Sequence, residues 1–190
     1  MKIGVLALQG DFDAHLRRLE ELGAEVVLVR KPEQLDEIDG LVLPGGESST
    51  ILRLLGEQGF QKLGEFVRSK PAFGTCAGAI LLAAEVENPS QKGLCAIDIT
   101  VRRNAYGRQI DSTILSGPSR LPGGPLEQVY IRAPRIERTG PGVEVLAERG
   151  GYAVLVRQGR KMAATFHPEL TSDTRVHQEF LKLVQEEEGK

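Results

Sequence analysis

The sequence of 190 residues contains only two cysteines, Cys76 and Cys95, and three histidines. Two cysteines are too few for a disulfide framework, which makes a reducing cytoplasm the default compartment. The cysteines and histidines are also not clustered at the spacing of metal ligands. The sequence therefore predicts neither a disulfide-stabilised fold nor a metal site, and we expect no cofactor.

The sequence also lacks a long hydrophobic segment and an excess of charge of one sign. The first apolar run, Ile3–Leu8, has six residues, which are too few to cross a membrane or to act as a signal peptide. The 24 basic and 26 acidic residues are interspersed along the chain and leave a net charge of −2. This balance indicates no nucleic-acid partner and no membrane partner.

Strand-like and helix-like segments alternate in the first half of the chain. Continuous apolar runs are typical of buried parallel strands, and apolar residues three and four positions apart are typical of helices. We expect strands at 3–8, 26–29, 41–43 and 70–73 and helices at 12–22, 51–55, 60–67 and 77–85. This alternation predicts a doubly wound parallel sheet.

The second half contains mostly strand-like segments with glycine-rich turns between them. We expect strands at 97–101, 110–115, 129–131, 143–147, 152–156 and 162–166. These segments predict antiparallel strands added to the sheet. An amphipathic helix at 171–188 closes the chain, with Val176, Phe180, Leu183 and Val184 on its inner face. No linker or repeat interrupts residues 1–190, so we expect one domain.

Cys76 lies in the pentapeptide Gly-Thr-Cys-Ala-Gly, between an expected strand and the helix that begins at Ala77. This spacing matches the nucleophile elbow, with cysteine in place of serine. Glycines flank such a nucleophile because a Cβ atom would crowd the sharp turn. The following helix start lowers the pKa of a thiol and offers N–H groups to an oxyanion. The alternative is that Cys76 is a small buried hydrophobic residue, as we expect of Cys95 in its apolar run.

His167 follows the expected strand at 162–166, and Pro168 and Glu169 come next. Ligands of open α/β sheets bind at the carboxyl ends of strands, where His167 would lie. A cysteine, a histidine and a carboxylate are sufficient for a nucleophile, its base and an orienting group. His15 and His177 fall within helical segments away from strand ends, so we expect them to be ordinary polar residues outside the site.

A second loop, Pro44–Thr50, also follows a strand and opens a helix. A glycine-rich turn at a helix start can bind phosphate, but the P-loop pattern and its lysine are absent. The other reading is that the glycine N–H groups bind an oxyanion while Glu47 and Ser48 hold a polar substrate. In a parallel sheet this loop and Cys76 would lie at the same edge.

Three separated motifs resemble those of class I glutamine amidotransferases: Leu41–Gly46, Gly74–Gly78 and His167–Glu169. Most members of that class carry a glutamine two residues after the second elbow glycine, whereas this chain has Ile80. The difference argues against the subunits that serve tryptophan, purine, pyrimidine or histidine synthesis.

Within the class, the chain resembles the glutaminase subunits of pyridoxal 5′-phosphate synthases from Ile3 to the last helix. Further matching segments are Leu6–Gly10, Gly45–Ser48, Arg103–Gln109 and Ile131–Pro134. The resemblance implies a three-layer α/β fold, in which helices flank a mostly parallel, flavodoxin-like sheet with added antiparallel strands.

The resemblance also implies the reaction and the residues that perform it. The Cys76 thiolate would attack the side-chain carboxamide of L-glutamine, with His167 moving protons and Glu169 orienting His167. Backbone N–H groups of Gly46 and Ala77 would bind the oxyanion. Carried over from the family, the contacts to glutamine would come from Gly46, Glu47, Ser48, Arg103, Ile131 and Arg132, and Gln9 would sense the partner subunit.

The partner that the resemblance implies is a (β/α)8 synthase subunit, which joins the ammonia with ribose 5-phosphate and glyceraldehyde 3-phosphate. No such barrel fits within 190 residues, so we expect a hetero-oligomer with another chain. Two alternatives stay open. One is a partner-independent cysteine hydrolase of the same fold, such as a γ-glutamyl hydrolase, and the other is a non-catalytic regulatory binding module.

Overall fold

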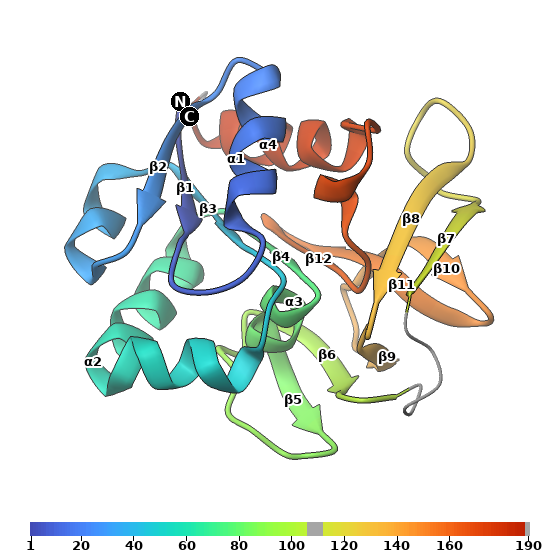
Figure 1. Cartoon of the computed structure of the whole chain (residues 1–190), viewed down its shortest axis with the longest axis horizontal. Helices are drawn as coiled ribbons and strands as arrows, with labels where there is room; N and C mark the ends of the chain where they lie inside the picture. The colour runs from blue at the N-terminus through green and yellow to red at the C-terminus, as the bar shows by residue number, and fades with distance from the viewer. Residues whose placement is uncertain (106–111, 189–190) are drawn as a thin grey trace.

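The structure, a computed structural model, describes residues 1–105 and 112–188. In these residues a central sheet is formed by β1 (Lys2–Leu6), β2 (Glu25–Val29), β3 (Gly40–Leu43), β4 (Ala72–Thr75), β10 (Glu144–Arg149), β11 (Tyr152–Gln158) and β12 (Lys161–Ala164). Their order across the sheet is β10-β11-β12-β4-β3-β1-β2 (Figure 1). The strands from β12 to β2 are parallel, while β10 and β11 extend the sheet as antiparallel strands.

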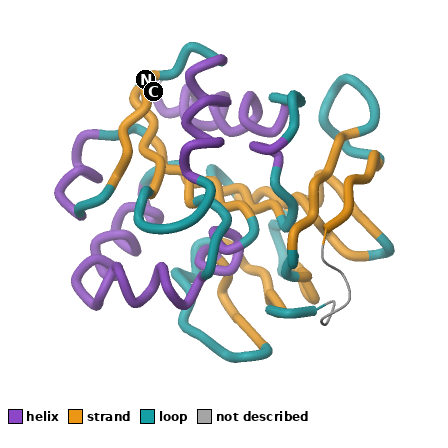
Figure 2. The backbone as a smooth tube through the Cα atoms, in the orientation of Figure 1, coloured by secondary structure: helices purple, strands orange, loops and turns teal. Residues whose placement is uncertain are grey.

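Helices cover both faces of this sheet and complete three layers (Figure 2). The helices α1 (Phe12–Glu21) and α4 (Arg175–Glu188) pack on one face, and α2 (Ser48–Ser69) and α3 (Ala77–Leu82) pack on the other. Successive residues of a strand point to opposite faces. Val5 of β1 therefore joins the core under α1 and α4, while Leu6 joins the core under α2.

Two smaller sheets lie beside the carboxyl ends of the parallel strands (Figure 1). One contains β5 (Ala83–Glu87), β6 (Ile97–Arg102) and β9 (Arg135–Thr139), and the other is a hairpin of β7 (Ser112–Gly117) and β8 (Leu126–Ile131). The short helices η1 (Pro32–Glu37) and η3 (Pro168–Leu170) complete the described elements. The segments that follow β6 and β8 contribute walls to the site described below.

The predicted α/β class is confirmed, since a mostly parallel sheet is flanked by helices and extended by antiparallel strands. The helix expected at 77–85 is wrong at its end, because the chain leaves α3 after Leu82 and pairs with β6 as β5. The helices expected at 51–55 and 60–67 are one element, α2, bent at Gly56. Only β10 and β11 of the later strands extend the central sheet as antiparallel neighbours, since β12 is parallel to β4.

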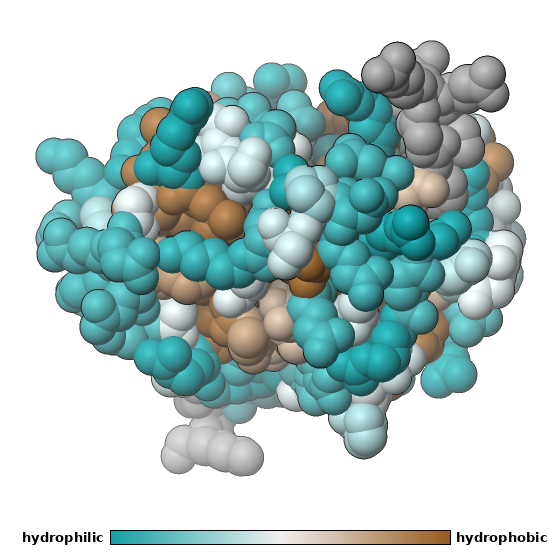
Figure 3. All heavy atoms as spheres, turned by 90° about the horizontal axis from the view of Figure 1, so that it is seen from below, coloured by the Kyte–Doolittle hydropathy of each residue, from teal (hydrophilic) through white to brown (hydrophobic). Residues whose placement is uncertain are grey.

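Positions 110 and 111 of one expected strand, and residues 106–109 of one matching segment, lie outside the described residues. Seen from the side of α2 and β5, the surface is mainly hydrophilic with small apolar patches (Figure 3). Among the described helices, none combines the length and the apolar character that crossing a membrane requires.

Candidate active site

Cys76 lies on a sharp turn between β4 and α3, as the glycine spacing predicts. Its backbone has a φ of 48° and a ψ of −102°, in a region that side chains other than glycine rarely adopt. A Cβ atom on Gly74 would overlap the backbone of Gly78, and one on Gly78 would overlap the carbonyl group of Leu43. The turn is thus closed so tightly against the sheet that only glycine fits on either side of the thiol.

The backbone around Cys76 fixes this turn to its neighbours. The Cys76 N–H donates a hydrogen bond to the Ala164 carbonyl oxygen of β12 at 2.8 Å, and the Cys76 carbonyl accepts one from the Ile80 N–H at 3.2 Å. The first bond ties the elbow to the strand that leads to His167. The second begins the hydrogen bonding of α3.

His167 and Glu169 are both buried beside this turn. The backbone N–H of His167 donates a hydrogen bond to the Val129 carbonyl oxygen at 2.8 Å, which anchors the segment after β12 to β8. Nδ1 of the His167 ring lies 2.7 Å from Oε1 of Glu169, so Nδ1 carries the proton in this hydrogen bond. That arrangement leaves Nε2 of His167 for its hydrogen bond with the Cys76 side chain.

The surroundings of His167 favour its charged form. Burial works to lower the pKa of His167, but the hydrogen bonds with Cys76 and Glu169 and their charges raise it to about 10. Glu169 is also desolvated, yet His15 and His167 hold its pKa below the usual range. An imidazolium at neutral pH is the partner that stabilises a thiolate, which is the nucleophilic form of cysteine.

A loop from β3 closes over His167 and Cys76. A Cβ atom on Gly45 would overlap the His167 ring, and one on Gly46 would overlap Oε1 of Gln9. The same Gln9 oxygen accepts a hydrogen bond from the Glu47 N–H at 2.7 Å. The loop after β3 therefore lies against the His167 ring, and Gln9 holds the residue after Gly46.

A cavity of about 340 Å³ opens between these loops and the segments after β6 and β8. Its size is within the range that small-molecule sites occupy. It is lined by Gln9, Asp11, Gly46, Glu47, Ser48, Cys76, Ile80, Arg103, Asn104, Ile131, Arg132, Pro134 and His167. The structure thus brings Cys76, His167 and all six expected glutamine-contacting residues to one cavity.

Two expected site residues do not line the cavity. Ala77 is fully buried as the first residue of α3, directly after Cys76. Glu169 is only 2% exposed, and its carboxylate contacts Nδ1 of His167 without reaching the cavity. Both positions are next to residues that do line the cavity.

Glu47 holds the start of α2 and one arginine of the cavity. Its carboxylate accepts hydrogen bonds from the N–H and hydroxyl groups of Ser49 and Thr50, and it lies 3.1 Å from Nη2 of Arg103. The hydrogen bond from the Ser49 hydroxyl is the largest reason that the pKa of Glu47 falls to about 2. Glu47 is therefore ionised at neutral pH and fixes the Arg103 guanidinium at the cavity wall.

Asp11, which sequence reasoning missed, also faces His167. Its Oδ2 lies 3.8 Å from Nδ1 of His167, and ligand atoms of Asp11, His167 and Glu169 all lie within 4.8 Å of one another. A cation bound there would have to displace the hydrogen bond between His167 and Glu169. These three residues are therefore better suited to hold a proton than a metal.

Two expectations about residues near the site are wrong. His15 and His177 are fully buried, and His15 lies 3.4 Å from Glu169, because α1 and α4 both pack over β4 at this point. Cys95 is exposed rather than part of the core, because it lies in the irregular segment before β6. A short apolar run did not distinguish a buried position from this exposed one.

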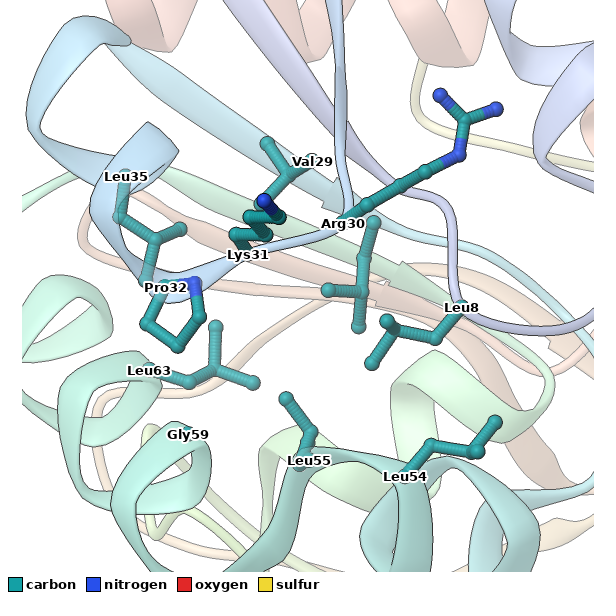
Figure 4. Close-up of a pocket in the computed structure, with 11 residues that line it drawn as sticks. Leu8, Val29, Arg30, Lys31, Pro32, Leu35, Leu54, Leu55, Gly59 and Leu63 are labelled. Atoms are coloured by element: carbon teal, nitrogen blue, oxygen red, sulfur yellow. The ribbon is translucent and has the colours of Figure 1, made fainter.

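A second hollow lies away from Cys76, between β1, β2, η1 and α2 (Figure 4). Leucine side chains dominate its walls, as the close-up shows for Leu8, Leu35, Leu55 and Leu63. Apart from Arg30 and Lys31, its described lining residues are apolar or glycine, and none carries a thiol, an imidazole or a carboxylate, whereas the cavity at Cys76 contains all three groups.

Comparisons with known proteins show the family of this chain. A model of the SNO glutamine amidotransferase family matches residues 5–186. A pyridoxal 5′-phosphate synthase subunit PdxT of Koribacter versatilis is 72% identical over 184 residues, which cover 97% of this chain and 96% of the relative. The subunit of the same name from Thermotoga maritima is 50% identical over 188 residues, covering 97% and 100%.

Solved structures show the same fold. A crystal structure described as glutamine amidotransferase superposes with a TM-score of 0.88 at 47% identity and covers 96% of this chain and 98% of its own. A glutamine amidotransferase of Thermotoga maritima has a TM-score of 0.61 at 15% identity, covering 98% and 84%, and supports the fold alone.

Proposed function

We propose that this chain, which belongs to the SNO glutamine amidotransferase family, hydrolyses L-glutamine to L-glutamate and ammonia and passes the ammonia to a pyridoxal 5′-phosphate synthase subunit for vitamin B6 biosynthesis. The observation that carries the proposal is the buried hydrogen-bonded series of Cys76, His167 and Glu169, of which Cys76 and His167 line one cavity. We assign residues 1–190 to one glutaminase domain that acts in the cytoplasm.

Cys76 is the nucleophile in this proposal. Its thiolate attacks the side-chain carboxamide carbon of glutamine and forms a tetrahedral intermediate. The carbon–nitrogen bond then breaks, and the nitrogen takes a proton from the His167 imidazolium and leaves as ammonia. Water attacks the remaining γ-glutamyl thioester with His167 as base, which releases glutamate and restores the thiolate. Glu169 keeps the Nδ1 proton of His167 in place throughout.

The oxyanion of each tetrahedral intermediate is bound by the N–H groups of Gly46 and Ala77 in our assignment. Gly46 lies in the loop that contacts His167, and Ala77 follows the nucleophile. One such donor typically contributes about 3 kcal/mol to transition-state stabilisation. Because Gln9 binds the N–H of Glu47, the next residue, we infer that docking of the synthase subunit near Gln9 completes this loop.

We assign the binding of glutamine to residues that line the cavity. Arg103 and Arg132 suit the α-carboxylate, because a guanidinium can bind a carboxylate through two hydrogen bonds. Glu47 and Ser48 present polar groups from the start of α2, and Ile131 supplies an apolar wall. Arg103 enters this role already fixed by Glu47.

The decisive experiment compares two nitrogen sources in a complex of the chain with the synthase subunit. Replacing Cys76 by alanine is expected to abolish synthesis of pyridoxal 5′-phosphate from glutamine while synthesis from ammonium continues. Loss of both would mean that Cys76 serves assembly rather than chemistry. Glutamine turnover is measured in parallel with and without the synthase subunit. Equal rates would contradict activation by docking and favour the partner-independent hydrolase.

A further inference from the structure

A closed group of polar side chains lies behind Glu169, outside the cavity. It consists of His15 from α1, His177 from α4 and Thr75, the last residue of β4, which directly precedes Cys76. The two histidines and Thr75 are fully buried, and Glu169 is 2% exposed. The plane of the Phe73 ring lies at nearly 90° to the planes of both imidazole rings, so one aromatic side chain packs against both histidines. Nothing in the proposed reaction uses these three residues.

The group forms one continuous series of polar contacts that ends at the carboxylate. Nε2 of His177 lies 2.9 Å from Nδ1 of His15. Nε2 of His15 lies 3.0 Å from the Thr75 hydroxyl oxygen and 3.4 Å from Oε2 of Glu169. The other carboxylate oxygen, Oε1, accepts from His167. Glu169 therefore lies between two histidines, one on each oxygen.

The contacts decide which nitrogen of each ring carries a proton. Burial lowers the pKa of His15, and it lowers the pKa of His177 to about 3, so both rings are neutral and each has one N–H. A proton on Nε2 of His15 is donated to the Thr75 hydroxyl oxygen and lies close to Oε2 of Glu169 without a hydrogen bond to it, and Nδ1 is then the acceptor from Nε2 of His177. The reverse assignment would turn the lone pair of Nε2 of His15 toward the Glu169 carboxylate and bury a proton on Nδ1 of His177, which has no partner among the described residues.

We propose that His15 and His177 are positioning residues for glutamine hydrolysis, which orient the Glu169 carboxylate through the attraction between the Nε2 proton of His15 and Oε2, 3.4 Å away. His177 acts one step further away, because its own N–H holds His15 in the required tautomer. A fixed carboxylate keeps the proton of His167 on Nδ1 and Nε2 directed at Cys76. The inference rests on the proposed function and extends its machinery from three side chains to five.

The geometry separates this role from simple packing. A packing role requires only volume at position 177, whereas the positioning role requires a donor at the place of Nε2. Glutamine places its amide N–H near the position of a histidine Nε2 and leucine has no donor, so His177→Gln and His177→Leu form a matched pair. His15→Gln and His15→Leu test the same distinction one step nearer to Glu169.

Alkylation of Cys76 by iodoacetamide at pH 6.5 reads out the effect without glutamine and without the synthase subunit. A displaced Glu169 no longer supports the charge on His167, so fewer molecules hold the thiolate and imidazolium together. We expect His177→Leu to label Cys76 about tenfold more slowly than the wild-type chain, and His177→Gln to label it at nearly the wild-type rate. The exposed Cys95 in the same molecule is the internal reference, and its rate should not change.

Kinetics with the synthase subunit provide the second readout. The Leu variant should lower kcat for glutamine hydrolysis by the same factor as the labelling rate and leave KM unchanged, because no residue of the cavity is altered. Equal Cys76 rates in the Leu and Gln variants would overturn the inference, as would losses that only follow the folded fraction measured by circular dichroism. A wild-type Cys76 that reacts no faster than Cys95 would instead refute the proposed function, and the inference with it.

Discussion

Replacing His177 by glutamine should change how the stability of the protein depends on pH. His177 is fully buried, and burial, followed by the neighbouring His15, lowers its pKa to about 3 from the ordinary histidine value of 6.5. Between these two values the unfolded chain binds a proton at this position and the folded chain does not. The free energy of unfolding attributable to His177 is therefore complete above pH 6.5 and decreases as the pH falls toward 3.

The size of the effect follows from the two pKa values. Each pH unit inside this window changes the free energy of unfolding by about 1.4 kcal/mol for one proton. Acidification from pH 7.5 to pH 5 should therefore cost the wild-type chain about 2 kcal/mol through His177 alone. Glu169 adds nothing comparable there, because an unperturbed glutamate titrates at 4.5, below this range, and the pKa of Glu169 in the folded chain is lower still. The glutamine variant has no such group at position 177.

Urea denaturation at pH 5, 6, 6.5 and 7.5 measures the difference. We expect the glutamine variant to be less stable than the wild-type chain at pH 7.5 and this gap to shrink by about 2 kcal/mol at pH 5. Phe180→Leu is the matched control, because Phe180 is also fully buried on α4 but does not titrate. The difference in free energy of unfolding between Phe180→Leu and the wild-type chain should stay constant at all four pH values. If the glutamine variant gave a constant gap as well, His177 would not be neutral in the folded protein and the argument would fail.

Three further predictions concern the elbow, the loop and the triad. Gly78→Ala should destabilise the protein by about 3 kcal/mol, because the new Cβ atom overlaps the Leu43 carbonyl group. Thermal denaturation should show a lower Tm, and an unchanged Tm would mean that the turn can relax. Glu47→Ala should lower the free energy of unfolding by about 1 kcal/mol, because α2 loses its N-terminal cap. The same change should raise KM for glutamine, because Arg103 loses its ion pair. An unchanged KM would show that the position of Arg103 does not affect substrate binding. Glu169→Gln should lower the pKa of His167, so that Cys76 alkylation at pH 6.5 slows relative to Cys95; equal slowing of both thiols would point to unfolding.

The parallel core of the fold could be predicted because its strands are uninterrupted apolar runs. β1, β2 and β3 lie within one or two residues of their expected positions. In β1 and β3 the apolar run follows from burial on both faces, which admits few polar residues. The turn at Cys76 was equally predictable, because a sharp turn leaves no room for a Cβ atom at the positions of its glycines. The boundary at Leu82 was not, because the run 77–84 is apolar throughout and suits a buried helix as well as a buried strand. β9 was not predicted, because its sequence Arg-Ile-Glu-Arg-Thr has a single large apolar residue.

The two buried histidines show a different limit, since their helices were predicted while their environment was not. His15 lies three residues after Phe12 and four before Leu19, on the same face as the apolar residues that identified α1. His177 likewise precedes Phe180 by three residues and Val184 by seven, on the inner face of α4. A helical period that places a histidine on the apolar face predicts burial, and burial of a polar ring requires a partner. The identity of that partner depends on how α1 and α4 meet over β4. This packing brings together His15 and His177, which are 162 residues apart, and no local sequence pattern predicts such a contact.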